Sequence, residues 1–227
     1  MLGRRLSLVV CVAAALAQAG ETPAEKGPTR VVVVQDKTPV LFEQNQIGEL
    51  AEGTRLEVRQ RYAGWVMVRA QLGPNWFIGW VREAAVAPDS LANVDIKIAP
   101  TRPTTAYRRP DTRRLITPPP GNDFLEVRVK FEPREGCPTK VFLDFADERT
   151  ADFYLRFSTG AKALPYAFIR KVEGITLPTF EQQDKRQTLI LEPGKSFIHT
   201  YLFVVPPRIR TATLVLKDRS VEVPLRR

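Results

Sequence analysis

Histidine and cysteine are nearly missing from this chain of 227 residues, which has one histidine, His199, and two cysteines, Cys11 and Cys137. A structural zinc site needs about four nitrogen, sulfur or oxygen ligands, mostly histidine and cysteine, so the sequence predicts no metal site. His199 lies in an apolar run with no nucleophile or orienting acid close to it in sequence, which disfavours a histidine-based triad. No glycine-rich phosphate loop occurs either, and we expect no cofactor.

The other reactive side chains form no recognisable catalytic arrangement. Cys137 lies in the turn-like segment Glu135–Pro138, without the activating partner that a nucleophilic thiol needs. The carboxylates of Asp144, Asp147 and Glu148 raise the idea of a glycosidase pair, but they surround a predicted turn and are interpreted as solvated loop charge. We therefore expect a protein that is not an enzyme. A hydrolase with an unrecognised site stays open as an alternative.

No apolar run in this chain is long enough to span a bilayer, and the most prominent one lies at the start. The run Leu6–Leu16 follows two arginines and precedes an Ala-x-Ala pattern, which is the order found in a signal peptide and too short for a bilayer span. We predict that residues 1–19 are removed and that the chain is exported to the periplasm or the extracellular space, with no transmembrane span in the mature protein. Cys137 then has no intramolecular partner, and an intermolecular disulfide stays open.

Helical periodicity is also missing, and the composition divides the chain into three blocks. Residues 29–88 and 122–227 carry short alternating apolar runs, which are typical of strands. Residues 89–121 contain six prolines between Pro100 and Pro120 and predict an extended Pro/Arg-rich linker. The sequence thus predicts two all-β domains joined by a tether.

The formal net charge of +9 does not indicate a nucleic-acid partner, because the cations are not gathered in one folded block. Four of them cluster within the linker, at Arg108, Arg109, Arg113 and Arg114. These arginines either keep the tether solvated, which we favour, or make a peripheral contact with an anionic surface.

All three tryptophans lie within 17 residues of the first domain, in the segment GWVMVRAQLGPNWFIGW, residues 64–80. Alternation predicts strands at residues 29–35, 55–59, 65–70 and 76–82, with a turn at Gly73-Pro74-Asn75. Short strands of this kind favour a small closed barrel.

The same block resembles the bacterial SH3-like domains. Their pattern runs G-x-L-x-x-G-x-x-L-x-V, then G-W-x-x-V, then G-W-V, and this chain has matching segments at 48–58, 64–68 and 79–81. The resemblance covers residues 30–87 and implies an SH3-like barrel that binds an extended chain. The segment Pro39–Gln44 departs from the N-V-R-x-G-P pattern of many members, which weakens the carry-over of a ligand from the wall-binding members.

Four aromatic residues of this block are the candidate binding site: Tyr62, Trp65, Trp76 and Trp80. Neighbouring strand residues point to opposite faces, so Trp65 and Trp80 are expected opposite the core candidates Val66, Val68 and Val81. The rings either line a groove for a glycan or peptide or only cover the open ends of a barrel.

The C-terminal block carries eight strand candidates, at residues 124–131, 139–145, 152–157, 166–172, 188–191, 197–205, 211–217 and 220–225. Their spacing predicts a β-sandwich, and the run 197–205 is apolar enough for a central strand. The stretch LEPGKSFIHTYLFVVPP, residues 191–207, resembles the telokin-like, immunoglobulin-like domains of secreted bacterial proteins. That resemblance implies an immunoglobulin-like fold and no functional residues.

These observations predict an exported, non-catalytic binding protein. Its SH3-like domain is expected to recognise a cell-envelope ligand of the peptidoglycan type, a glycan or a peptide. An assembly or scaffold protein that binds another envelope protein is the alternative.

Overall fold

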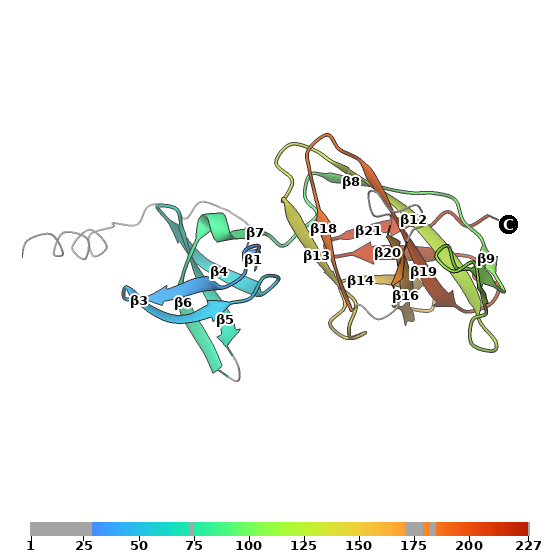
Figure 1. The fold of residues 1–227 in the computed structure, drawn as a ribbon, viewed down its shortest axis with the longest axis horizontal. Helices are drawn as coiled ribbons and strands as arrows, with labels where there is room; N and C mark the ends of the chain where they lie inside the picture. The colour runs from blue at the N-terminus through green and yellow to red at the C-terminus, as the bar shows by residue number, and fades with distance from the viewer. Residues whose placement is uncertain (1–28, 73–74, 171–178, 182–184, 227) are drawn as a thin grey trace, which may run out of the picture. The chain divides into compact units, whose positions relative to one another are not determined.

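The computed structural model describes residues 29–72, 75–170, 179–181 and 185–226. The expected signal peptide, residues 1–19, lies outside these residues. Among the residues described, every regular element apart from one short 3-10 helix, η1 (Glu83–Ala85), is a β-strand, so the all-β class is confirmed (Figure 1). Within the described residues, no helix could cross a membrane. The chain divides into two compact units, with the boundary between Val86 and Ala87.

The first unit is one seven-stranded sheet with the order β3-β2-β6-β5-β4-β1-β7. Its strands are β1 (Arg30–Val33), β2 (Thr38–Phe42), β3 (Asn45–Leu50), β4 (Arg55–Tyr62), β5 (Trp65–Leu72), β6 (Asn75–Arg82) and β7 (Val86–Pro88). The sheet curls around a cluster of small aliphatic side chains, including Val33, Val40, Leu56 and Val68. The alternation of the sequence explains this core, because Val66, Val68 and Ala70 of β5 are apolar and buried at every second position.

The expected closure of this sheet into a barrel is not seen among the described strands. β3 and β7 stand at the two ends of the sheet order, and no pairing joins them. Asn45, Gln46 and Ile47 of β3 are all exposed. The start of β3 therefore lacks the inward apolar side chains that closure would bury.

The second unit contains a six-stranded sheet with the order β17-β16-β19-β12-β8, to which β9 adds beside β8 along β12. Its strands are β8 (Val94–Ile98), β9 (Pro103–Thr104), β12 (Asp123–Pro133), β16 (Pro165–Arg170), β17 (Thr179–Glu181) and β19 (Phe197–Val205). All eight strands expected in residues 122–227 have a counterpart in the structure, although the last two residues of the one expected at 166–172 lie outside the described residues. The second half of β19 is buried on both faces, as its apolar sequence predicts, with Tyr201 and Leu202 both at 0 % exposure, while Ile198 in the first half is exposed.

Smaller sheets complete this unit. They are β13 (Lys140–Asp144) with β18 (Arg186–Ile190), and the four-stranded set of β15 (Lys162–Ala163), β14 (Phe153–Phe157), β20 (Ala212–Leu216) and β21 (Arg219–Glu222). One core cluster takes side chains from the six-stranded sheet and from both smaller sheets, among them Val127, Leu143 and Leu214. The sheets thus form layers around a common apolar interior.

The predicted tether at residues 89–121 is wrong for most of its length. Leu91 and Val94 are fully buried in the second unit's core, and β8 and β9 pair with β12. The hairpin of β10 (Tyr107–Arg108) and β11 (Leu115–Ile116) packs against a separate cluster around Phe124. Proline is tolerated here because these short strands lie at a sheet edge. At an edge the backbone N–H that proline lacks is not needed for a hydrogen bond to a neighbouring strand.

Candidate functional site: an aromatic and cationic sheet face

The two faces of β5 and β6 have opposite character. Val66, Val68 and Val81 point into the core, each with 0 % exposure. Their sequence neighbours therefore point to the other side of the sheet. The prediction that Trp65 and Trp80 lie opposite these valines agrees with the register.

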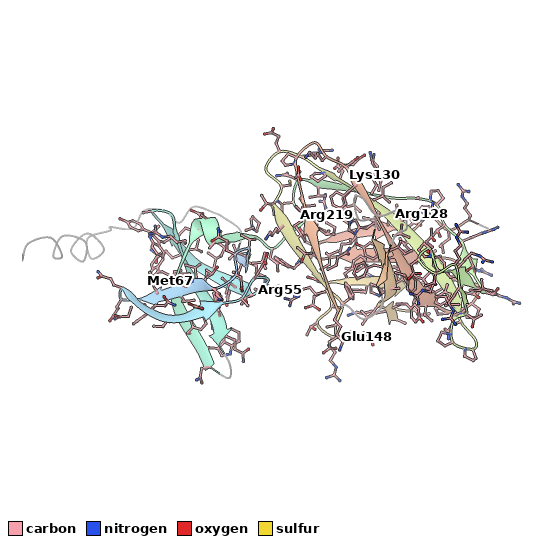
Figure 2. All side chains as sticks on the ribbon, in the orientation of Figure 1. Arg55, Met67, Arg128, Lys130, Glu148 and Arg219 are labelled. Carbon is pink, nitrogen blue, oxygen red and sulfur yellow. The ribbon has the colours of Figure 1, made fainter. Side chains whose placement is uncertain are left out.

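Cross-strand partners share a face, and the register sets the composition of the outer one. Trp65 pairs with Arg82, Met67 with Trp80, Arg69 with Ile78, and Gln71 with Trp76. We call the outer surface the Trp–Arg face and define it by Trp65, Met67, Arg69, Trp76, Ile78, Trp80 and Arg82. Met67, which is labelled in Figure 2, belongs to β5.

The predicted residues line this face but do not converge on one point. Tyr62 pairs with Trp65 at the β4–β5 turn, and Trp80 pairs with Leu41 of β2. Trp76 lies near the opposite end of β5 and β6, six positions along from the Trp65 pair. At the strand rise this separation is about 20 Å. The aromatic residues therefore form a strip along the sheet, suited in length to an extended chain.

Much of the strip meets solvent. Trp76 is 60 % exposed, Ile78 49 % and Tyr62 39 %, while Trp65 and Trp80 are half-buried. Large side chains at such exposure contribute little to the unit's own core. Sequence reasoning missed Ile78 as part of the site. The alternation of β6 places Ile78 on the same face as Trp76 and Trp80 and could have identified it.

Two arginines, also missed from the sequence, stack on the indole rings. The guanidinium carbon of Arg82 lies 4.0 Å from the centre of the Trp65 ring, and that of Arg69 lies 4.6 Å from the Trp76 ring. Each contact contributes about 0.5–1 kcal/mol at an exposed site. The stacking orients the rings and adds positive charge to an apolar strip, so the face can contact apolar ring surfaces and attract carboxylates together.

The local sequence fixes the strands that carry this face. The β4–β5 turn consists of Ala63 and Gly64, both with positive φ, at 46° and 78°. Such a two-residue turn matches the twist of a hairpin. Gly79, beside Trp80, is required for space, since a Cβ there would lie 2.5 Å from Val40 Cγ1. The absence of a side chain lets β6 pass close to β2.

The side chains weighed for catalysis have structural partners. His199 Nδ1 lies 2.6 Å from Gln187 Nε2, and Gln187 Oε1 accepts a hydrogen bond from the Tyr201 hydroxyl at 2.6 Å. Cys137 is half-buried against the core, and burial raises the pKa of its thiol, which favours the unreactive protonated form. No group of three or more potential metal ligands occurs in the part of the chain that the structure describes.

The carboxylates weighed as a glycosidase pair lie at a turn. Asp144 accepts a hydrogen bond from the Ala146 amide and pairs with Arg186. Asp147 accepts from the Arg149 amide at 2.9 Å. These bonds organise the loop.

The four arginines expected in a tether belong to the β10–β11 hairpin. Arg109 binds Asp111 through two nitrogens and lies 4.5 Å from the Phe180 ring centre. Arg108 donates to the carbonyl of Arg113 at 3.0 Å, and Arg114 is exposed.

The Trp–Arg face is thus an exposed aromatic strip with stacked cations on one side of a small sheet. No protein-family model matches this chain, and neither a curated protein nor a solved structure matches it.

Proposed function

We propose that this chain is an exported, non-catalytic binding protein whose SH3-like domain, residues 29–88, binds a peptidoglycan-type glycan or peptide of the cell envelope. The single observation that carries the proposal is the Trp–Arg face, where Trp76 is 60 % exposed beside stacked arginines. Exposed apolar strips on small domains commonly mark binding surfaces. The exposed apolar side chains of such a strip are removed from water only when a ligand covers them.

The chemistry of the face suits this ligand. An indole offers a flat apolar surface and a single N–H donor, which complements the C–H face of a sugar ring and its hydroxyl groups. Arg69 and Arg82 match the carboxylates of peptide stems, because a guanidinium binds a carboxylate through two parallel hydrogen bonds. The length of the strip, from Tyr62 to Trp76, favours a ligand with repeated units.

The finer fold assignments belong to the same proposal. The short strands with an aliphatic core and the motifs at 48–58, 64–68 and 79–81 support an SH3-like domain. The layered sheets around one core support an immunoglobulin-like sandwich in the second unit. Export is supported by the residue pattern at 1–19.

The test is co-sedimentation of the full chain with purified peptidoglycan sacculi. Trp76→Ala and Arg69→Gln should each lower the bound fraction at least about tenfold, as expected for residues that anchor an interface. Phe42→Ala is the matched control, because Phe42 is 49 % exposed in the same unit and its β2 neighbour Leu41, not Phe42, pairs with Trp80. Equal loss in the control and in Trp76→Ala would overturn the proposal.

The rival functions give different results in the same experiment. If sacculi do not bind but the Trp–Arg face crosslinks to an envelope protein, the chain is a scaffold and the wall ligand is wrong. If soluble fragments are released from sacculi in proportion to time, the chain is a hydrolase, and the non-catalytic assignment is wrong.

A further inference from the structure

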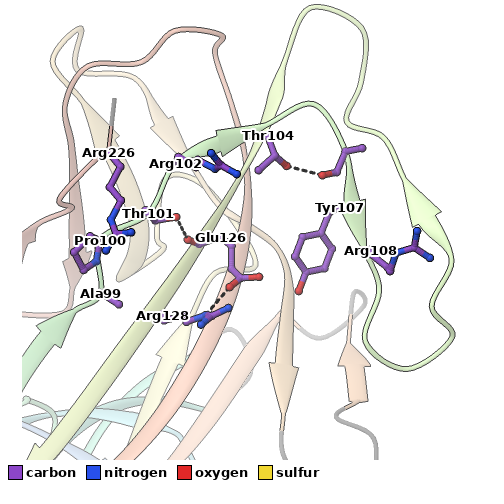
Figure 3. A pocket seen from close by; sticks show the side chains of 11 residues that line it. Ala99, Pro100, Thr101, Arg102, Thr104, Tyr107, Arg108, Glu126, Arg128 and Arg226 are labelled. Atoms are coloured by element: carbon purple, nitrogen blue, oxygen red, sulfur yellow. Dashed lines mark hydrogen bonds and ion pairs between the residues drawn. The ribbon is translucent and has the colours of Figure 1, made fainter.

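A polar hollow of about 620 Å³ lies in the second unit, where the pairing along one edge of β12 is interrupted (Figure 3). Ile98 of β8 pairs with Val129 and Pro103 of β9 pairs with Leu125. Residues 99–102 between them leave the regular ladder. Thr101 instead forms a parallel bridge with Leu225 near the C-terminus.

Hydrogen bonds hold this departure in place. The Thr101 hydroxyl donates to the carbonyl of Glu126 at 2.5 Å. The Arg226 amide donates to the carbonyl of Thr101 at 2.6 Å. Segments from three parts of the chain, around Thr101, Glu126 and Arg226, therefore form one fixed wall.

The hollow carries a strong positive excess. Four arginines line it, Arg102, Arg108, Arg128 and Arg226, against the single carboxylate of Glu126. Both Glu126 and Arg128 are on the outer side of β12, because Val127 and Val129 between and beside them are buried. The arrangement favours an anion.

Most of the guanidinium donors in the hollow are available. Glu126 accepts from Arg128 Nε at 2.6 Å, which leaves the terminal nitrogens of Arg128. Within residues 29–226 as described, the guanidinium groups of Arg102 and Arg226 have no hydrogen-bond or ion-pair partner. A guanidinium has five N–H donors, so these three side chains bring several donors to the lining of the hollow.

Two further groups line the hollow and suit hydroxyls. Tyr107 is anchored by ring contacts with Phe124 and Phe180. Burial, and then the charge and hydrogen bond of Glu126, raise the pKa of its phenol well above the ordinary value. The phenol therefore stays protonated as a donor, and the carboxylate of Glu126 is an acceptor.

We propose that this hollow binds a phosphate ester of a sugar or polyol, with Arg102, Arg128 and Arg226 holding the phosphate and Glu126 accepting hydrogen bonds from hydroxyl groups. Arginine matches phosphate oxygens through paired hydrogen bonds. The volume lies in the range of small-molecule sites. The negative charge of Glu126 repels a ligand that carries only anionic groups, but its carboxylate can accept hydrogen bonds from a ligand that also carries hydroxyl groups. The same chemistry occurs in soluble sugar phosphates and in glycerophospholipid headgroups.

The test is isothermal titration of the full chain with three probes. These are glucose 6-phosphate, inorganic phosphate, and phosphatidylcholine vesicles with and without phosphatidylglycerol. The double variant Arg102→Gln/Arg226→Gln should weaken binding of the ester about tenfold or more, because charged hydrogen bonds are lost. The matched control is Arg156→Gln/Arg210→Gln, which removes the same charge from exposed positions outside the hollow and should leave the dissociation constant unchanged.

Saturable binding of glucose 6-phosphate supports a soluble ligand, and saturable binding only to phosphatidylglycerol vesicles supports a lipid headgroup. Either result supports the site when Arg102→Gln/Arg226→Gln weakens that binding about tenfold or more and the control variant does not. The proposal is overturned if no phosphate ester binds, if the control variant loses binding equally, or if inorganic phosphate binds as tightly as the ester. Trp76→Ala should not change these titrations, since Trp76 belongs to the other unit.

Discussion

The two units use aromatic residues in opposite ways. In residues 29–86 the buried core is aliphatic, with Phe77 packed against it partly buried, and the three tryptophans and Tyr62 lie on the Trp–Arg face or at its rim. In residues 87–227 the rings fill the interior, where Phe131, Phe153 and Tyr201 are each 0 % exposed. The same residue class therefore supports packing in one unit and is presented to solvent in the other.

The difference follows from the size of each interior. A single curled sheet of short strands encloses little volume, and valine and leucine fill it. An indole forced into that space would overpack it, at a cost of about 1–3 kcal/mol. The layered second unit has room for rings that contact one another, as in the pair Phe153 and Tyr201 with centroids 4.4 Å apart.

The largest expected effect comes from removing a ring of the second interior. Phe153→Ala should lower the free energy of unfolding of that unit by about 3–5 kcal/mol, from lost burial and the cavity left behind. Far-UV circular dichroism follows both units during denaturation, while tryptophan fluorescence follows only the first, because all three tryptophans lie at positions 65–80. The fluorescence midpoint should not move. An equal shift in both signals would show that the two units do not unfold independently.

A smaller loss of stability is expected from removing a buried hydrogen bond in the interior of the second unit. Tyr201→Phe leaves Gln187 Oε1 without its 2.6 Å donor and should cost about 1–3 kcal/mol. Tyr154→Phe, at a partly exposed ring, is the control and should cost almost nothing.

The same variant has a defined pH dependence. Burial raises the pKa of the Tyr201 phenol far above its ordinary value. Above about pH 10 the phenol loses its proton in the unfolded chain but not in the folded one. The contribution of this group to stability is thus present below that pH and falls as the pH rises further. The gap between wild type and Tyr201→Phe should narrow in denaturation curves recorded above pH 10.

Truncation on the Trp–Arg face should cost less again. Trp76→Ala removes a stacked contact with Arg69 and should lower stability by about 1 kcal/mol or less. Leu56→Ala, in the core of the same unit at 2 % exposure, should cost about 2–5 kcal/mol. Thermal melts of both variants give the comparison. A cost for Trp76→Ala equal to that for Leu56→Ala would identify the indole as part of the core.

The smallest effect is a gain. The β2–β3 turn places Glu43 and Gln44 at positive φ, 46° and 72°, where side chains are disfavoured. Gln44→Gly should raise the stability of the first unit by about 0.5 kcal/mol, because relief of strain exceeds the added chain entropy. Ala63, at positive φ in the β4–β5 turn, offers a second position, and Ala63→Gly should act in the same direction.

Alternation along single strands predicted much of this fold. The alternation of β5 indicates that Val66 and Val68 are buried, and the apolar run of β19 indicates that Tyr201, Leu202 and Phe203 are buried, and the structure agrees. Ile198, near the start of β19, is 60 % exposed despite its apolar neighbours. The contacts between strands could not be predicted in this way, because they depend on how distant segments pair. That Arg82 covers Trp65 depends on the register between β5 and β6, and no pattern within either strand contains it.

Residues 89–121 show a different limit. Composition indicated a tether, because six prolines outweigh scattered apolar residues. Leu91, Val94, Tyr107 and Ile116 nevertheless find buried or half-buried positions. Whether such isolated residues are buried depends on the free edge of β12 and on the outer surface of Phe124, which are formed by distant sequence. The hollow beside Thr101 has the same origin and could not be predicted from its own residues.

The position of β12 also sets a folding order. Val129 pairs with Ile98 on one side and with His199 on the other, and Thr101 pairs with Leu225. The second unit thus joins nearly its first residues to nearly its last, a high contact order that slows folding. The β4–β5–β6 meander needs only neighbouring residues. During synthesis the first unit can therefore form its meander early, while the bridge of Thr101 in the second unit must wait for Leu225.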